Sequence, residues 1–379
     1  MPSEPGLFDA IYARGPAAAQ VSDAAWLQAM LDVEAALARA CAAEGLTPVR
    51  DAEAIAAACV AERFDLARLG REAADSATPV VGLVTALRAA VPESARAHVH
   101  LGATSQDIAD TALMLIARRA LVGLLADARA AADAAAALAD AHRATPMIGR
   151  TLLQQALPIT FGLRAAGWLV GLDEGRRRLE AVDAAELAVQ MGGPVGARGP
   201  AIAARVAAEL ALAEPVLPWQ AIRVRPVALA AALGGFCGVL AKIARDVTLL
   251  AQQEVAECRE GGGAQRGGSS AMAHKRNPVG AVSVLACTKR TPGLVATAMA
   301  AMEQEHERAA GAWQAEWGTY GELLTLTGSA TAWTRELLEG LVVDPERMRA
   351  NLAAAATGDA PVPPDAAALV DRALEAHRR

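Results

Sequence analysis

One glycine-rich stretch, GGGAQRGGSSAMAHKRNP at 261–278, holds the residue types best suited to chemistry in this chain. Asn277 followed by Pro278 is typical of a helix cap, so we expect a helix to begin there with Pro278 as its first residue. Lys275 lies six residues after Ser269. A nearby lysine and a helix N-terminus would make a serine alkoxide less costly. This glycine loop (261–278) is either a catalytic loop or a surface linker, and spacing alone leaves both open.

Two other kinds of site do not fit the chain. A phosphate-binding loop requires GxxxxGK followed by serine or threonine after a strand, and the sequence has no such pattern. The HExxH and HxxEH zinc motifs are absent as well. The five cysteines form no CxxC pair, which favours free thiols in a reducing cytoplasm. They are Cys41, Cys59, Cys237, Cys258 and Cys287.

A second polar stretch, HVHLGATSQDIADTA at 98–112, opens a long helical pattern and is called the first motif below. Thr104, Ser105 and Asp107 fall at the expected helix start, where free N–H groups and the helix dipole favour an anion. A substrate carboxylate could bind there, or Thr104 or Ser105 could simply cap the helix. His100 by itself is more often a structural histidine than a catalyst.

The third polar stretch, GRTLLQQALP at 149–158, is called the second motif below. We expect Arg150, Thr151 and Gln154 to precede or open another long helix. The Arg150 guanidinium could form a two-pronged contact with a substrate carboxylate, or it could pair with a neighbouring acidic side chain. The sequence leaves these two roles evenly balanced.

The elements that must position these motifs are helical in pattern. Hydrophobic residues make up 54% of the chain and aromatic residues only 3%, and the excess is alanine, a strong helix former. We expect Pro158 and Pro292 to kink two of the helices. Few β-branched residues alternate, so no major sheet is expected, and long helices that are apolar on several faces predict an oligomeric bundle. The long patterns lie at 22–45, 110–144, 152–190, 226–260, 279–306 and 318–340.

The charge balance narrows the classes of partner. A net charge of −6 and a pI near 5.6 argue against nucleic acid and anionic membranes. The longest uncharged run, 226–241, is short for a span of about 20 residues. The first residues, MPSEPGLFDAIYARG, lack the pattern of a signal peptide. We therefore expect a cytoplasmic protein that binds a small anion in a local cationic pocket.

The three stretches together resemble a known superfamily. GGSSAMAHKRNP resembles the GSSxMPxKxNP signature of the fumarase/aspartase superfamily, and LGATSQDIADTA and GRTLLQQALPITFG resemble its other two motifs in the same order. The resemblance covers roughly 7–352. It implies an all-α, fumarase/aspartase-like elongated long-helix bundle and a homotetramer whose core takes helices from four subunits. Each active site would draw its three motifs from three subunits. The expected domains are 1–105, a central bundle at 106–342 and a shortened helical segment at 343–379.

Within the superfamily, three stretches are similar to the 3-carboxy-cis,cis-muconate cycloisomerase family. They are LQQALPITFGLRAAGWL at 153–169, SSAMAHKRNPVGA at 269–281 and QEHERAAGAWQAEW at 304–317. The resemblance implies cyclisation to 4-carboxymuconolactone, a step of protocatechuate breakdown, through an aci-carboxylate intermediate. It places the proton donor on Ser269 and the charge-stabilising groups on Lys275, Asn277 and the helix end near Pro278. No metal or organic cofactor is implied, because the substrate carries its own electron sink. The positions expected to bind the tricarboxylate substrate are His100, Thr104, Ser105, Gln106, Arg150, Thr151, Gln154, Ser270, Met272, Arg276 and Arg308, with Asp107 completing the TSQD motif.

Two apolar residues favour cyclisation over elimination. Superfamily lyases usually carry a histidine directly after GRT and a glutamate thirteen residues after the loop serine, and here Leu152 and Val282 stand in those places. Release of an amine needs proton delivery of that kind. Lactonisation does not, because the attacking carboxylate is already ionised at pH 7. The family's cycloisomerases often have tryptophan at the position of Leu152, and Ala273 replaces the usual loop proline.

Two other functions stay open at this point. One is a β-elimination lyase acting on a succinyl-type substrate, adenylosuccinate lyase-like or an amino-acid lyase, for which His100 is the motif histidine available as an acid. The other is a helical scaffold without activity, against which the joint presence of Ser269, Lys275 and Asn277 argues.

Overall fold

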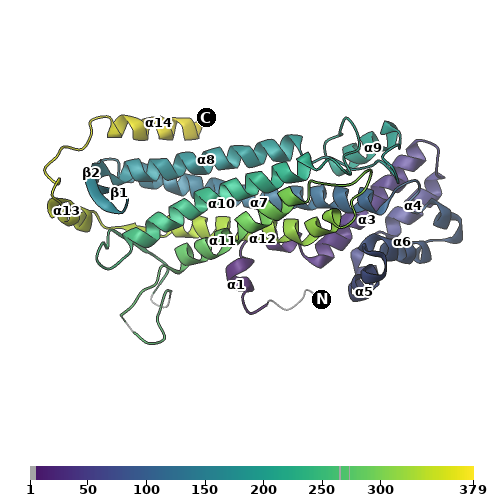
Figure 1. The fold of residues 1–379 in the computed structure, drawn as a ribbon, viewed down its shortest axis with the longest axis horizontal. Helices are drawn as coiled ribbons and strands as arrows, with labels where there is room; N and C mark the ends of the chain where they lie inside the picture. The colour runs from purple at the N-terminus through teal and green to yellow at the C-terminus, as the bar shows by residue number, and fades with distance from the viewer. Residues whose placement is uncertain (1–5, 264–265, 273) are drawn as a thin grey trace.

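Five long helices run side by side along the longest axis of an elongated molecule (Figure 1). The computed structural model describes residues 6–263, 266–272 and 274–379. The shorter helices gather mainly at the two ends of this bundle, and the all-α prediction is confirmed apart from two small two-stranded sheets. The five long helices are α7 (Ser105–Ala141), α8 (Phe161–Ala185), α10 (Val224–Leu250), α11 (Val279–Ala300) and α12 (Ala312–Glu339).

The N-terminal helices cover the end of the bundle where α7 begins. The longest of these N-terminal helices is α3 (Asp23–Ala43). It starts after Ser22, whose hydroxyl accepts the N–H of Ala25 as a cap. The predicted boundary after residue 105 falls at the beginning of α7, and the one after 342 falls within β4 (Leu341–Val343); both stay predictions. The remaining helices are α1 (Asp9–Tyr12), α2 (Ala17–Gln20), α3 (Asp23–Ala43), α4 (Val49–Ala58), α5 (Leu66–Ser76), α6 (Pro79–Ala90), α9 (Pro200–Leu210), α13 (Pro345–Ala353) and α14 (Ala366–Arg378), with 3-10 turns at Ala61–Arg63 and Glu93–His98.

The helix expected from residue 152 is wrong over its first nine positions. The second motif instead forms a hairpin in which β1 (Pro146–Thr151) pairs antiparallel with β2 (Gln154–Thr160), and α8 begins only at Phe161. Pro158 therefore lies in a strand and kinks nothing, whereas Pro292 does lie inside α11.

Two leucines make the turn of this hairpin. Leu152 and Leu153 both have positive φ, 49° and 64°, as a two-residue turn between twisted strands requires. Glycine and asparagine are the usual residues there, so the sequence carried no turn signal. Both side chains are exposed, Leu152 at 96% of its surface. A second two-stranded sheet pairs β3 (Cys258–Glu260) antiparallel with β4 (Leu341–Val343) and brings the end of α12 to the base of the glycine loop.

The most apolar helix of the bundle is α10. By length and hydropathy it could cross a membrane. It packs against α8, α11 and α12, and at Gly175 of α8 an added Cβ would lie only 2.4 Å from the ring of Phe236. This close packing identifies α10 as a core helix of the bundle. A buried core helix of a soluble protein passes the same test of length and hydropathy, so the test by itself does not indicate a membrane span.

The five cysteines are buried and form no disulfide, so each is a free thiol. Burial raises the pKa of all five, to about 12 for Cys59 and Cys258 and to about 11 for Cys237. Because only the thiolate alkylates, we expect native protein at pH 8 to resist iodoacetamide while urea-unfolded protein takes up five labels. Mass spectrometry of both samples checks this, and rapid labelling of the native protein would contradict the buried placement.

Candidate active site

The three motifs lie at two ends of the molecule. The first motif is at the beginning of α7, whereas the second motif and the glycine loop lie beyond its other end (Figure 1). A helix of the length of α7 spans about 55 Å. One chain therefore separates the first motif from the other two by most of the length of the bundle.

At the helix start in the first motif, the N–H of Thr104 is already paired with an acidic side chain of the protein. The Asp107 carboxylate accepts N–H bonds from Thr104, Gly192 and Gly193 at 3.1, 2.9 and 2.8 Å. Burial raises the pKa of Asp107, and these donors oppose that rise. Thr104 takes the N-cap position of α7, and its backbone N–H, not its hydroxyl, makes the contact with the Asp107 side chain. Thr104 and Ser105 are half-buried.

Gln106 is fully buried and makes contacts within the protein. Its amide donates to Asp110 and to the carbonyl of Gln220 at 3.1 and 2.7 Å. Its oxygen accepts from Nε of Arg308 at 3.2 Å, and Arg308 also donates to the carbonyl of Pro194. The structure thus joins two predicted binding residues, Gln106 and Arg308, and shows that Gln106 holds the arginine in place.

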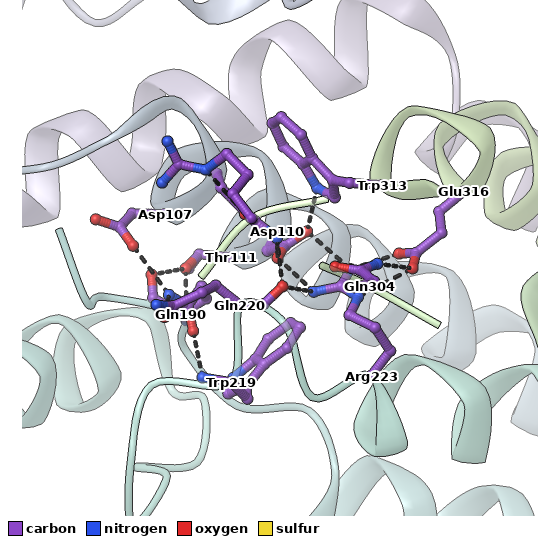
Figure 2. A network of polar contacts seen from close by, with 12 residues as sticks. Asp107, Asp110, Thr111, Gln190, Trp219, Gln220, Arg223, Gln304, Trp313 and Glu316 are labelled. Carbon is purple, nitrogen blue, oxygen red and sulfur yellow. Dashed lines mark hydrogen bonds and ion pairs between the residues drawn. The ribbon is translucent and has the colours of Figure 1, made fainter. Parts of the chain in front are cut away.

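A buried ion cluster next to Gln106 was missed by sequence reasoning, although Asp110 lies in the first motif and Glu316 in the 304–317 stretch (Figure 2). Arg223 has no exposed side-chain surface; it bonds Asp110 through two nitrogens at 2.6 and 3.0 Å and Glu316 through Nε at 2.9 Å. Its guanidinium carbon lies 4.9 Å from the centre of the Trp219 ring. Trp313 donates to Asp110 at 2.9 Å. The cluster fixes α7, α10 and α12 together.

The cluster also shifts the acidity of its members. Burial raises the pKa of Glu316, and Arg223 opposes the rise. For Arg223 burial alone would lower the pKa, but Asp110 and Glu316 outweigh it and raise the pKa above its ordinary value. Arg223 therefore stays charged, and two carboxylates depend on that one cation. Gln304, from the 304–317 stretch, donates to Glu316 at 3.1 Å.

His100 has a structural partner. Its Nδ1 lies 2.6 Å from Oε1 of Glu34, which is fully buried. The backbone at His100 has φ 61°, a conformation that costs energy for residues other than glycine. The contact agrees with the structural reading of this histidine; a role in substrate binding stays a prediction.

Arg150 is also paired with an acid of the protein. Its two terminal nitrogens donate to both oxygens of Glu257 at 2.9 and 2.8 Å, and Asn351 donates to Glu257 at 2.9 Å. Of the two roles left open for Arg150, the structure shows the ion pair. Thr151 and Gln154 are exposed at the hairpin tip.

The glycine loop presents Ser269 with its hydroxyl oxygen already hydrogen-bonded. Oγ accepts the N–H groups of Ala271 and Met272 at 3.3 and 3.2 Å, which leaves the hydroxyl proton free to be donated. Lys275 is exposed, and Asn277 is half-buried and donates from Nδ2 to the carbonyl of Gly267 at 3.2 Å. Of the other loop predictions, Ser270, Met272 and Arg276 are exposed, and Ala273 lies outside the described residues.

The helix end after the loop differs from the expectation. α11 begins at Val279 with Pro278 as its cap residue, one position later than predicted. The N–H groups of Gly280 and Ala281 are taken by Glu260, and that of Val282 bonds the carbonyl of Pro278. The proposal that this helix end stabilises substrate charge or the serine alkoxide is therefore wrong, because its donors already have partners.

A cavity of about 980 Å³ opens at the base of the glycine loop. Arg276 and Asn277 line it together with Glu260 and Arg349. Ser269 and Lys275, further along the described part of the loop, are not among the lining residues. This cavity therefore does not hold the expected proton donor, and we do not assign it as the reaction site.

Comparison with known proteins identifies the family to which the chain belongs. The sequence profile of the family described as "Lyase" matches residues 10–293. The chain is 46% identical over 355 residues to the 3-carboxy-cis,cis-muconate cycloisomerase of Pseudomonas aeruginosa, which covers 91% of this chain and 77% of that protein. It is 47% identical over 365 residues to the nitrosuccinate lyase of Streptomyces davaonensis, covering 92% and 77%. The crystal structure of the 3-carboxy-cis,cis-muconate lactonizing enzyme from Pseudomonas putida matches with a TM-score of 0.92 at 37% identity, over 98% of this chain and 99% of that one.

The chain belongs to this lyase family, within the fumarase/aspartase superfamily. The resemblance carried by the three motifs is confirmed, and so is the elongated all-α fold.

Proposed function

We propose that the protein is a 3-carboxy-cis,cis-muconate cycloisomerase that forms 4-carboxymuconolactone. Three relatives of that name are 44–47% identical to the chain, and a fourth is 39% identical. The observation that favours cyclisation over an elimination that must protonate its leaving group is the pair Leu152 and Val282. Both apolar side chains are exposed, at 96% and 52%, so neither is a core residue and neither can move a proton. An intramolecular carboxylate attack needs no such group.

The proposed mechanism uses the residues of the glycine loop. A carboxylate oxygen of the substrate bonds to the conjugated diene, and the displaced electron pair moves into a second carboxylate. Lys275 and the amide of Asn277, which has a second hydrogen besides the one given to Gly267, stabilise this charge. Ser269 then protonates the carbon, and the N–H groups of Ala271 and Met272 hold the alkoxide until solvent restores its proton. No metal or organic cofactor takes part.

A complete site requires more than one copy of the chain. The first motif and the glycine loop lie at opposite ends of the bundle, too far apart to contact one small tricarboxylate. Packing of bundles in opposite directions would bring the first motif of one copy beside the loop of another. We therefore propose a cytoplasmic homotetramer with shared sites, in which Thr104, Ser105, Thr151, Gln154, Ser270, Met272, Arg276 and Arg308 bind the substrate, and which has no nucleic-acid or membrane partner.

One assay tests the activity. Purified protein incubated with 3-carboxy-cis,cis-muconate should consume the diene absorbance and give the lactone, detected by NMR. Boiled protein is the control. Failure to consume the diene at any enzyme concentration would overturn the proposal.

A second activity has a specific observation in its favour. The nitrosuccinate lyase is as similar to the chain as the cycloisomerases are. A succinate whose leaving group departs as a stable anion needs no proton on that group, so the absence of a relay at Leu152 and Val282 does not exclude this elimination. Incubation with nitrosuccinate and detection of fumarate distinguishes the two activities; fumarate formation without diene turnover would establish the lyase.

A further inference from the structure

One carboxylate outside the motifs closes the base of the glycine loop. Glu260 is the last residue of β3, immediately before the loop, and its side chain is 7% exposed. Its two oxygens accept the N–H groups of Gly280 and Ala281 at 2.9 and 2.8 Å. These are donors of the first turn of α11, immediately after the loop. A single side chain thus joins the residue before the loop to the helix after it.

Other contacts hold the same base. The N–H of Gly261 bonds the carbonyl of Gly340 at 2.8 Å, and both nitrogens of Asn277 donate to the carbonyl of Gly267, the backbone one at 2.8 Å. Arg266 places Nε 3.8 Å from Glu260 and a terminal nitrogen 3.6 Å from Glu336. Several contacts therefore hold the base of the loop. Of the two acids named here, Glu260 is the one that bonds α11 directly.

We propose that Glu260 is a positioning residue for Lys275 and Asn277. Asn277 lies two residues before the first turn of α11, so the place of its side chain follows the place of that turn. A carboxylate at a helix N-terminus is favourable both as a charge and as a hydrogen-bond acceptor. Glu260 therefore fixes the helix start against β3 and keeps the charge-stabilising residues at a constant distance from Ser269. The assignment of those residues rests on the proposed function.

The experiment uses two variants of the full chain. Glu260→Gln keeps the size of the side chain but replaces one acceptor oxygen by a donor, so one N–H loses its bond. Gly280→Ala keeps Glu260 and adds a Cβ that would lie 3.1 Å from its Oε2, and alanine is well tolerated in a helix. Asp65→Asn is the matched control, because Asp65 caps α5 through the N–H of Arg68 without contacting the glycine loop.

We expect Glu260→Gln to lower kcat by about 100-fold, as misplacement by about 1 Å does, with KM changed less than about threefold. Gly280→Ala should lower kcat by roughly tenfold, and Asp65→Asn should leave it unchanged. Wild-type kcat in both Glu260→Gln and Gly280→Ala would overturn the proposal. A loss of kcat that is matched by Asp65→Asn would also overturn it, because any helix cap would then have the same effect.

A readout without substrate separates this proposal from the proposed function. Trypsin cleaves after the exposed Lys275 and Arg276, and mass spectrometry gives the rate. Cleavage should be about tenfold faster in Glu260→Gln than in wild type, because the loop base opens more often, and unchanged in Asp65→Asn. If Glu260→Gln does not fold, Gly280→Ala carries the same comparison. Equal cleavage rates would refute positioning, whereas absent muconate turnover by wild type would refute only the proposed function.

Discussion

Replacing Ser269 with alanine is expected to lower kcat for lactonisation by about a thousandfold while the fold stays intact. The general acid is then missing, and proton delivery by a positioned side chain contributes about 10²–10⁴ in rate. The Ser269 hydroxyl accepts the N–H groups of Ala271 and Met272, which are both exposed residues. Removal of the hydroxyl therefore leaves no buried donor unpaired. Steady-state kinetics with 3-carboxymuconate measures the effect, and KM should change little.

The matched control is Ser283→Ala. Ser283 lies in the first turns of α11 and donates only to the carbonyl of Val279, so the variant should keep kcat within about twofold. Wild-type kcat in Ser269→Ala would eliminate the serine as proton donor and direct attention to another acid. A rise in KM at constant kcat would instead show that Ser269 binds substrate without transferring a proton.

Replacing Arg223 with methionine is expected to destabilise the protein by about 3–5 kcal/mol, because removal of one partner leaves buried charge without compensation. Asp110 and Glu316 would then face each other with almost no exposed surface. Urea unfolding at one fixed protein concentration measures the free energy, since subunit association also contributes. Arg118→Met is the control: the pair of Arg118 with Asp183 is partly exposed, and its loss should cost less than about 1 kcal/mol. Equal losses in the two variants would contradict the buried cluster.

The same variant has a signed pH dependence. The pKa of Glu316 is raised in the folded protein by burial, so the folded state binds this proton more tightly than the unfolded chain does. The contribution of Glu316 to the free energy of unfolding is therefore complete below its ordinary pKa of 4.5, and it is lost as the pH rises through its raised pKa in the folded protein. Without Arg223 the pKa rises further. Arg223→Met should therefore regain stability when pH falls from about 7 to about 5, and by more than wild type does.

Local signals made much of the fold predictable. Ser22 before an apolar helical pattern predicted α3, and the TSQD segment predicted the start of α7, because capping and periodicity depend on neighbours within a few residues. The hairpin of the second motif was not predictable in this way. Strand pairing is a contact between two segments, and the turn at Leu152 and Leu153 uses residues that give no turn signal.

The order of residues alone specifies which groups the chain offers for chemistry: Ser269, Lys275 and Asn277 in one loop, and Leu152 and Val282 where a proton relay would otherwise stand. The surroundings of these groups depend on how the chain folds in three dimensions. In the folded chain, Arg150 pairs with Glu257, 107 residues away, and Arg223 pairs with Asp110, 113 residues away. Glu260 also occupies the helix end expected to face the substrate. Buried charges need partners, but any of many distant acids satisfies that need, so the choice depends on how the helices pack.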